Sequence, residues 1–262
     1  MTRGLSIIFY GPEGMGKTSL ALQFKKELLF ISVNENGYEN LDMVGDVPAN
    51  CEHIRATTFP QLKSAIKEAK HYSTVVIDSL SGVQQILADY ILKEHYSDKN
   101  DPQQAFASFS EGHRCHAPFY SEQICNELSA LNSQGVNTIL LGHTKSEIIK
   151  NPGGLDYNAT VIDLEQWSRG VYKKWAMAII YMTLNLDLIV TKKWKGTPQE
   201  SKAVTDLESD SDRIMYTTKN PTHEAKNLLK LPPYILMGDS PQEAYENLFK
   251  HMPPKIQEAQ AQ

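Results

Sequence analysis

The sequence predicts an α/β protein with a mainly parallel, twisted sheet and helices on both faces. Short apolar runs alternate with segments of helical periodicity along the 262 residues. The runs Thr74–Asp78 and Asn137–Gly142 are largely apolar, which is typical of strands that are covered on both faces of a sheet. Strands separated by helices indicate βαβ units, and such units produce parallel sheets.

The expected elements follow from apolar runs and from capping residues. In the helix expected from residue 59, Leu62 and Ile66 share one face and Thr58 is a suitable N-cap. We expect strands at 6–10, 28–33, 74–78, 137–142, 176–182, 188–193 and 213–218. We expect helices at 17–26, 59–70, after residue 78 to about 93, and at 119–133, 161–175 and 241–251.

The domain organisation is expected to be simple. No linker-like stretch divides the chain, so residues 1–251 are predicted to form one domain. Residues 96–118 are polar and rich in helix breakers, which indicates an insertion. Residues 144–159 contain Asn151, Pro152, Gly153 and Gly154 and are predicted to be a loop. The strand-rich last third suggests extra C-terminal strands, and residues 252–262 are expected to be a disordered tail.

Bulk composition restricts the function classes. The formal net charge is −5 and the pI is about 5.9, which argues against coating of duplex DNA by overall charge but allows a local basic groove. Three cysteines give no disulfide framework and fit a reducing compartment. No apolar run approaches the 18 residues that a membrane span needs, and the N-terminal apolar run leads into a glycine loop rather than a cleavage site. We therefore expect a cytoplasmic protein.

The strongest motif is a phosphate-binding loop. Residues 11–18 match G-x-x-x-x-G-K-[ST] at every fixed position, between a predicted strand and a predicted helix. Its backbone N–H groups would wrap the phosphates of ATP, Lys17 would reach the β- and γ-phosphates, and Thr18 would bind Mg²⁺. The nucleotide-binding residues expected are Gly11, Pro12, Glu13, Gly14, Met15, Gly16, Lys17, Thr18 and Ser19.

A second carboxylate is expected to share the metal. Asp78 ends an apolar strand, and in P-loop ATPases such an aspartate holds the magnesium ion, usually through water. Its place at the carboxyl end of a parallel strand is where sheets of this kind bind ligands. The alternative is that the aspartate caps the helix that follows, and both roles are compatible.

Two further strand ends resemble those of RecA-like ATPases. The run Leu-Leu-Phe-Ile-Ser-Val-Asn-Glu-Asn-Gly at 28–37 resembles their second strand, in which an acidic residue precedes a glycine. The resemblance implies that Glu35 polarises the attacking water. The run at 137–143 resembles the strand that ends in a polar sensor of the γ-phosphate, which implies that role for His143.

A C-terminal segment extends the resemblance. Ala225-Lys226-Asn227 with Leu231-Pro232 is similar to a segment of RecA-like helicases and phage ATPases in which a lysine and an arginine reach the γ-phosphate of the neighbouring subunit. Lys226 matches the lysine, whereas Leu228 stands at the arginine position. Arg213 at a strand start is another candidate for such a trans contact.

The whole chain, from residue 7 to about 233, looks like phage nucleotide-binding proteins related to the Sak-type single-strand-annealing ATPases. The resemblance implies recombination or annealing of phage DNA in the host cytoplasm. It also implies a homo-oligomeric ring or filament, single-stranded DNA and a single-strand-binding protein as partners.

Direct DNA contact would need positive charge beside aromatic stacking faces. The stretches 169–175 and 192–196 mix lysine with tryptophan, and the loop expected at 144–159 holds Lys145, Lys150 and Tyr157. The alternative is that these clusters lie at solvated edges or subunit contacts, because lysine stems cover apolar rings.

Other functions fit the sequence less well. His113, Cys115, His116 and Cys125 lack the paired spacing of a zinc site. A nucleotide kinase would clamp phosphates with clustered arginines, and a GTPase would need N-K-x-D, which the sequence does not contain. A module that binds ATP as a switch and hydrolyses it poorly stays an alternative, because Leu228 stands where the resemblance would place the arginine that reaches the neighbour's γ-phosphate.

Overall fold

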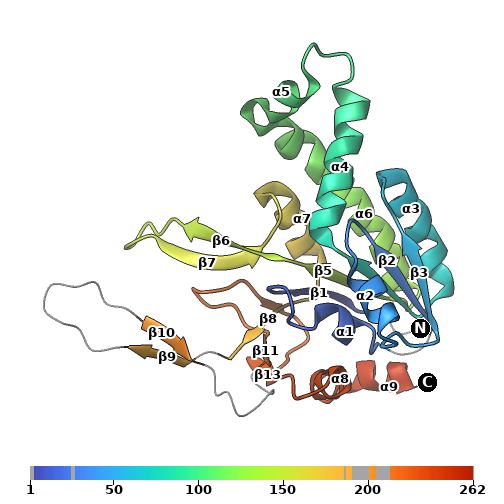
Figure 1. Cartoon of the computed structure of the whole chain (residues 1–262), viewed down its shortest axis with the longest axis vertical. Coiled ribbons are helices and arrows are strands. Elements are labelled where there is room, and N and C mark those ends of the chain that lie inside the picture. The colour runs from blue at the N-terminus through green and yellow to red at the C-terminus, as the bar shows by residue number, and fades with distance from the viewer. Residues whose placement is uncertain (1–2, 25–26, 186, 191–200, 205–212, 262) are drawn as a thin grey trace, which may run out of the picture.

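The computed structural model describes residues 3–24, 27–185, 187–190, 201–204 and 213–261. One large sheet organises this part of the chain (Figure 1). Across the sheet the strands follow the order β13 (Tyr234–Leu236), β11 (Arg213–Tyr216), β8 (Ala178–Leu184), β1 (Ser6–Tyr10), β5 (Asn137–Gly142), β4 (Thr74–Asp78), β2 (Leu28–Ser32) and β3 (Cys51–Arg55). The short β12 (Lys226–Asn227) also pairs with β8.

The six strands from β8 to β3 are parallel, and the C-terminal strands β11, β12 and β13 are antiparallel to their neighbours. The predicted α/β class with a mainly parallel sheet and extra C-terminal strands is therefore confirmed. Strand β5 lies between β1 and β4. Because β1, β5, β4 and β2 are parallel, the segments that follow them all leave from the same edge of the sheet.

Helices cover both faces of the sheet. Successive residues of β1 alternate between two cores, with Ile8 and Tyr10 in one and Ile7 and Phe9 in the other, as the two-residue period of a strand requires. The first core packs under α3 (Phe59–Glu68), α4 (Leu80–His95), α6 (Ala117–Ser133) and α7 (Gln166–Trp175). The second packs under α1 (Lys17–Ala21), α2 (Gly37–Met43) and α8 (Pro241–Phe249). Figure 1 shows α4 and α6 on one side of the sheet and α8 on the other.

The segment expected to be an insertion is helical. After α4 the chain forms α5 (Pro102–Ala107), a 3-10 turn at Ser108–Ser110 and a π-helical turn at Gly112–His116 that leads into α6. Figure 1 shows this excursion at the far end of α4. In this excursion the ring of Phe106 packs closely on Gly112. A methyl group added to Gly112 would lie 2.2 Å from the ring, so glycine allows this contact. Another 3-10 turn, Ala69–His71, ends α3.

Two expectations about irregular segments are wrong. Residues 144–159 form most of a hairpin of β6 (Thr144–Ile149) and β7 (Tyr157–Ile162) rather than a loop, and this hairpin projects away from the sheet (Figure 1). The Asn-Pro-Gly-Gly run is only its turn. The expected disordered tail contains α9 (Pro254–Ala261), in which Ile256 packs against the second core. Strand β9 (Asp187–Val190) pairs antiparallel with β10 (Ser201–Val204).

Candidate active site

The phosphate-binding loop joins β1 to α1, as predicted. Gly14 and Gly16 have φ values of 76° and 80°, a left-handed backbone that favours glycine. At Gly11 a methyl group would lie 2.2 Å from the carbonyl oxygen of Met182, so only glycine allows the loop to leave the sheet this close to β8. These three glycines fix the path of the loop.

The amine of Lys17 folds back over the loop. Its Nζ donates to the carbonyl oxygens of Gly11 at 2.9 Å and Pro12 at 2.7 Å. The side chain is buried, and burial lowers the pKa of Lys17 while the nearby carboxylates of Asp78, Glu13 and Glu35 act in the opposite direction. A cation thus sits inside the loop beside the two carboxylates singled out from the sequence.

Thr18 and Asp78 meet directly. The hydroxyl of Thr18 donates to Oδ2 of Asp78 at 3.0 Å. A methyl group at Gly37 would lie 3.0 Å from that hydroxyl and 3.2 Å from Oδ2, so a side chain there would crowd the pair. Asp78 is buried, and burial raises its pKa to about 6. An oxygen pair of this kind suits Mg²⁺, which takes few protein ligands and keeps several waters.

Glu35 is held by two donors from neighbouring strand ends. Its Oε1 accepts from the hydroxyl of Ser79 at 2.8 Å and from Nε2 of His143 at 2.8 Å. The three residues follow β2, β4 and β5, which end at the same edge of the sheet. No residue in the described ranges hydrogen-bonds to Oε2 of Glu35, and about 29% of its side chain is exposed. One carboxylate oxygen is thus fixed by two donors, and the other accepts no hydrogen bond from the described residues.

Ser79 and Gly82 were missed from the sequence. The Ser79 hydroxyl also caps α4 by accepting from the amide of Gly82, so Ser79 rather than Asp78 is the helix cap. A methyl group at Gly82 would lie 1.9 Å from the carbonyl oxygen of Val33. The missing side chain therefore lets α4 reach the end of β2. The helix cap could have been found from the sequence, because serine is one of the preferred N-cap residues.

Arg55 was also missed. From the edge strand β3 its guanidinium donates to the backbone oxygen of Glu35 at 3.1 Å, to the side chain of Asn36, and to the carboxylate of Glu39 at 2.7 Å. These bonds tie the Glu35 loop to β3. No sequence motif marks an arginine in this role.

The two residues expected to act on a neighbouring subunit, Lys226 and Arg213, lie against parts of their own chain. The amine of Lys226 donates to the carbonyl oxygens of Lys173 at 2.9 Å and Lys174 at 3.0 Å, in the last turn of α7. To reach the γ-phosphate of a neighbouring subunit the amine of Lys226 would have to be free, whereas here it is hydrogen-bonded within its own chain. Arg213 lies beside the phosphate-binding loop of its own chain, because a methyl group at Gly16 would be 3.2 Å from its Nη1.

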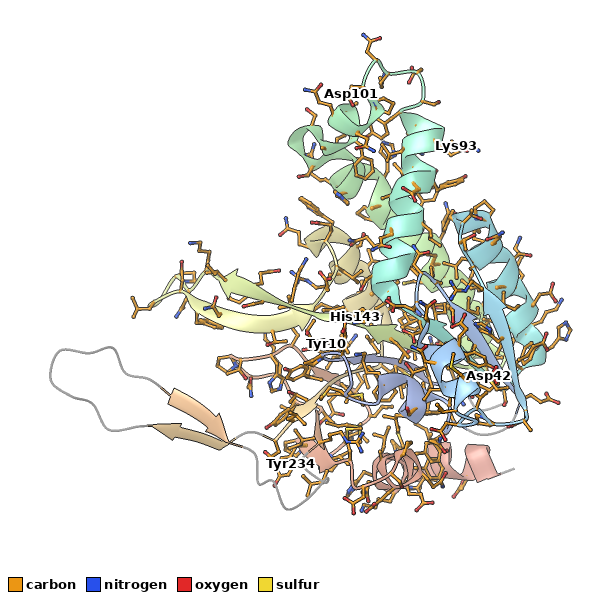
Figure 2. All side chains as sticks on the ribbon, in the orientation of Figure 1. Tyr10, Asp42, Lys93, Asp101, His143 and Tyr234 are labelled. Atoms are coloured by element: carbon orange, nitrogen blue, oxygen red, sulfur yellow. The ribbon has the colours of Figure 1, made fainter. Side chains whose placement is uncertain are left out.

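The candidate DNA-contacting residues are mostly paired. Arg169 is buried and forms an ion pair with Glu147 at 2.7 Å, and Lys173 pairs with Glu224 at 2.5 Å. The stretch 192–196 lies outside the described residues. On the β6–β7 hairpin, Leu155 is 91% and Ile148 62% exposed. His143 lies at the root of this hairpin beside Tyr10, at the carboxyl edge of the sheet (Figure 2).

Metal clusters and membrane-spanning helices are both absent from the described residues. These residues contain no cluster of three or more His, Cys, Asp or Glu side chains placed to hold a metal ion. This includes the segment with His113, Cys115 and His116. No described helix has the length and apolar character needed to cross a membrane.

Comparison with known proteins places the chain in a family. No curated protein sequence matches it. Among solved structures it is similar to a KaiC-like protein from the archaeon Pyrococcus horikoshii OT3, with 15% identity over 92% of this chain and 88% of that chain. The TM-score is 0.42. The family AAA_24, described as an AAA domain, matches residues 3–229. The chain therefore belongs to this family of AAA domains.

Proposed function

We propose that this protein binds ATP together with Mg²⁺ and hydrolyses it, and that Glu35 orients the attacking water. The observation that carries this proposal is the hydrogen-bonded Glu35 carboxylate, which lies next to the Thr18–Asp78 pair and the phosphate-binding loop. Burial lowers the pKa of Lys17 and raises the pKa of Asp78, which supports a site whose buried charges would be compensated by bound phosphates and a metal ion.

The residues divide the chemistry between them. Thr18 and, through water, Asp78 would hold the magnesium ion, which neutralises charge on the β- and γ-phosphates. Lys17 would exchange the carbonyls of Gly11 and Pro12 for phosphate oxygens. The free Oε2 of Glu35 would accept a hydrogen bond from water, whose oxygen attacks the γ-phosphorus while the bond to the β–γ bridging oxygen breaks.

His143 would link this chemistry to the hairpin. It donates to Oε1 of Glu35, and the next residue begins β6. A change at Glu35 on hydrolysis would therefore reach the hairpin through one side chain. Tyr157 and the largely exposed Lys150 lie on this hairpin, which makes the hairpin a candidate surface for single-stranded DNA. Together with the resemblance to annealing ATPases, this supports a role in phage-type recombination or annealing within a ring or filament, beside a single-strand-binding protein.

The test is ATP hydrolysis with and without single-stranded DNA and Mg²⁺. We expect turnover that requires Mg²⁺ and rises with DNA, and that is lost in K17A. The variant K67A, which changes an exposed lysine on α3, serves as the matched control. Hydrolysis that is insensitive to DNA would exclude the recombination role and leave the ATPase. Hydrolysis equal in K17A and the parent would exclude the site itself.

One observation favours a second candidate, a switch that binds ATP with little turnover. Lys226 is engaged by α7 and Leu228 replaces the expected arginine, so the finger contacts implied by the resemblance are absent from that segment. Binding of ATP by the parent with no detectable turnover under any DNA condition would select this candidate. Phosphate transfer to a nucleoside monophosphate would instead select the kinase.

A further inference from the structure

Arg213 lies on the opposite side of the phosphate-binding loop from the hydrolytic residues. Thr18, Asp78 and Glu35 place the γ-phosphate end over β5, β4 and β2. Strands β8 and β11 lie on the other side of β1. Since the loop after β1 holds the middle of the polyphosphate chain, the remaining end of the nucleotide leaves the loop toward β8 and β11.

The position of Arg213 on β11 is fixed by the backbone. It pairs with Leu184 at the carboxyl end of β8, and its carbonyl accepts from the amide of Met237 at 2.9 Å. This register brings the guanidinium to the loop edge of the sheet. A methyl group at Gly16 would lie 3.2 Å from Nη1 of Arg213 and 3.9 Å from the terminal carbon of Met237. Gly16 is thus covered by these two side chains.

Arg213 is half-buried as a residue, and its guanidinium has no hydrogen-bond or ion-pair partner in the ranges that the structure describes. Arginine carries five N–H donors in a rigid fork that matches phosphate oxygens. Of the other four arginines, Arg55 is paired with Glu39 and Arg169 with Glu147, while Arg3 and Arg114 are exposed to water. A guanidinium fork without a protein acceptor beside a phosphate-binding loop indicates that the acceptor is a ligand.

We propose that Arg213 binds the α-phosphate of the nucleotide held by its own chain. The inference rests on the proposed ATP site and adds a residue to it. It replaces the trans contact to the γ-phosphate that the sequence suggested for Arg213. An α-phosphate ligand stabilises ATP and ADP alike and takes no part in breaking the β–γ bond.

The test measures ATP and ADP affinity together with kcat for R213A and R213K. We expect R213A to weaken both nucleotides by a similar factor of about 10 to 100, the range for a charge-assisted hydrogen bond, with little change of kcat at saturating ATP. R213K should recover part of the affinity. The control R114A changes an exposed arginine far from the loop, and thermal unfolding verifies that each variant is folded.

Two outcomes would overturn the inference. The first is unchanged ADP affinity, whether or not kcat falls. The second is recovery of hydrolysis when R213A is mixed with K17A, because a neighbour could then supply the arginine in trans. The control K17A separates this failure from failure of the ATP site. If K17A keeps the full ATP affinity of the parent, the proposed ATP site is wrong. If K17A loses ATP affinity and R213A does not, only the role of Arg213 is excluded.

Discussion

The two sides of β1 differ in how their polar residues are placed. On the side of β5, β4 and β2, Asp78 ends a parallel strand and accepts from Thr18, while Glu35 and His143 each follow such a strand and Glu35 accepts from His143 and Ser79. On the side of β8 and β11, Lys226 serves a helix end and Arg213 lies beside its own loop. A strand end fixes where a side chain lies because parallel strands end together. A residue that is assigned only from similarity to a segment of other proteins, as Lys226 is, has no such constraint.

The strongest test of the hydrolytic side is E35Q. The amide cannot accept and orient water as the carboxylate does, so kcat should fall by about 10²–10⁴-fold, the usual contribution of a positioned base. ATP affinity should stay near that of the parent, because Glu35 does not hold the polyphosphate in this scheme. Steady-state hydrolysis and equilibrium binding of a fluorescent ATP analogue measure the two quantities.

The matched control for E35Q is E68Q, at an exposed glutamate on α3. Equal turnover by E35Q and the parent would remove Glu35 from the mechanism. An equal loss of affinity and turnover would instead make Glu35 a structural residue of the loop.

The same contrast governs how much could be predicted. The phosphate-binding loop, Asp78, Glu35 and His143 were found because each follows a buried apolar run. Strand β3 was missed because it is a half-exposed edge strand, Cys51–Arg55, with three polar residues among five. The β6–β7 hairpin was missed because it projects from the sheet, and its adjacent Ile148, which is exposed, and Ile149, which is half-buried, show no alternation of apolar and polar residues. Gly82 and Arg55 act through tertiary contacts that no local pattern records, whereas the helix cap at Ser79 left a local signal.

The buried Asp78 should make stability of the metal-free protein depend on pH. Burial raises its pKa to about 6, above the usual value of about 3.9, so the folded state binds the proton more tightly than the unfolded state. The charged carboxylate therefore destabilises the fold above pH 6, and its protonation stabilises the fold as pH falls toward 4. D78N should be more stable than the parent at pH 7.5, and this advantage should shrink by about 3 kcal/mol at most on going to pH 4.5.

Urea unfolding in EDTA at the two pH values measures this effect. The control D89N changes an exposed aspartate on α4 and should show no such trend. A stability difference between D78N and the parent that is the same at both pH values would contradict the raised pKa.

The contact between α4 and the end of β2 can be tested at Gly82. In G82A the added methyl group would overlap the carbonyl oxygen of Val33, and relief of such overlap costs about 1–3 kcal/mol. Because α4 begins at the cap Ser79, its displacement should also lower kcat. The matched control is G170A, since Gly170 in α7 has no atom within 4 Å of an added methyl group and alanine favours a helix. Urea unfolding should show G82A destabilised and G170A stabilised.

The smallest effect is expected at Lys226. Its substitution separates a structural role within its own chain from a contact with the γ-phosphate of a neighbouring subunit. If its amine only satisfies the carbonyls of Lys173 and Lys174, K226A should lower the free energy of unfolding by about 1 kcal/mol, as for a typical hydrogen bond. Its kcat per folded molecule should then equal that of the control K219A, which changes an exposed lysine. A trans finger would give the reverse, with stability unchanged, kcat reduced, and hydrolysis restored by mixing K226A with K17A. That result would show that Lys226 leaves α7 when subunits assemble, and it would make the β8 side part of the hydrolytic site of a neighbour.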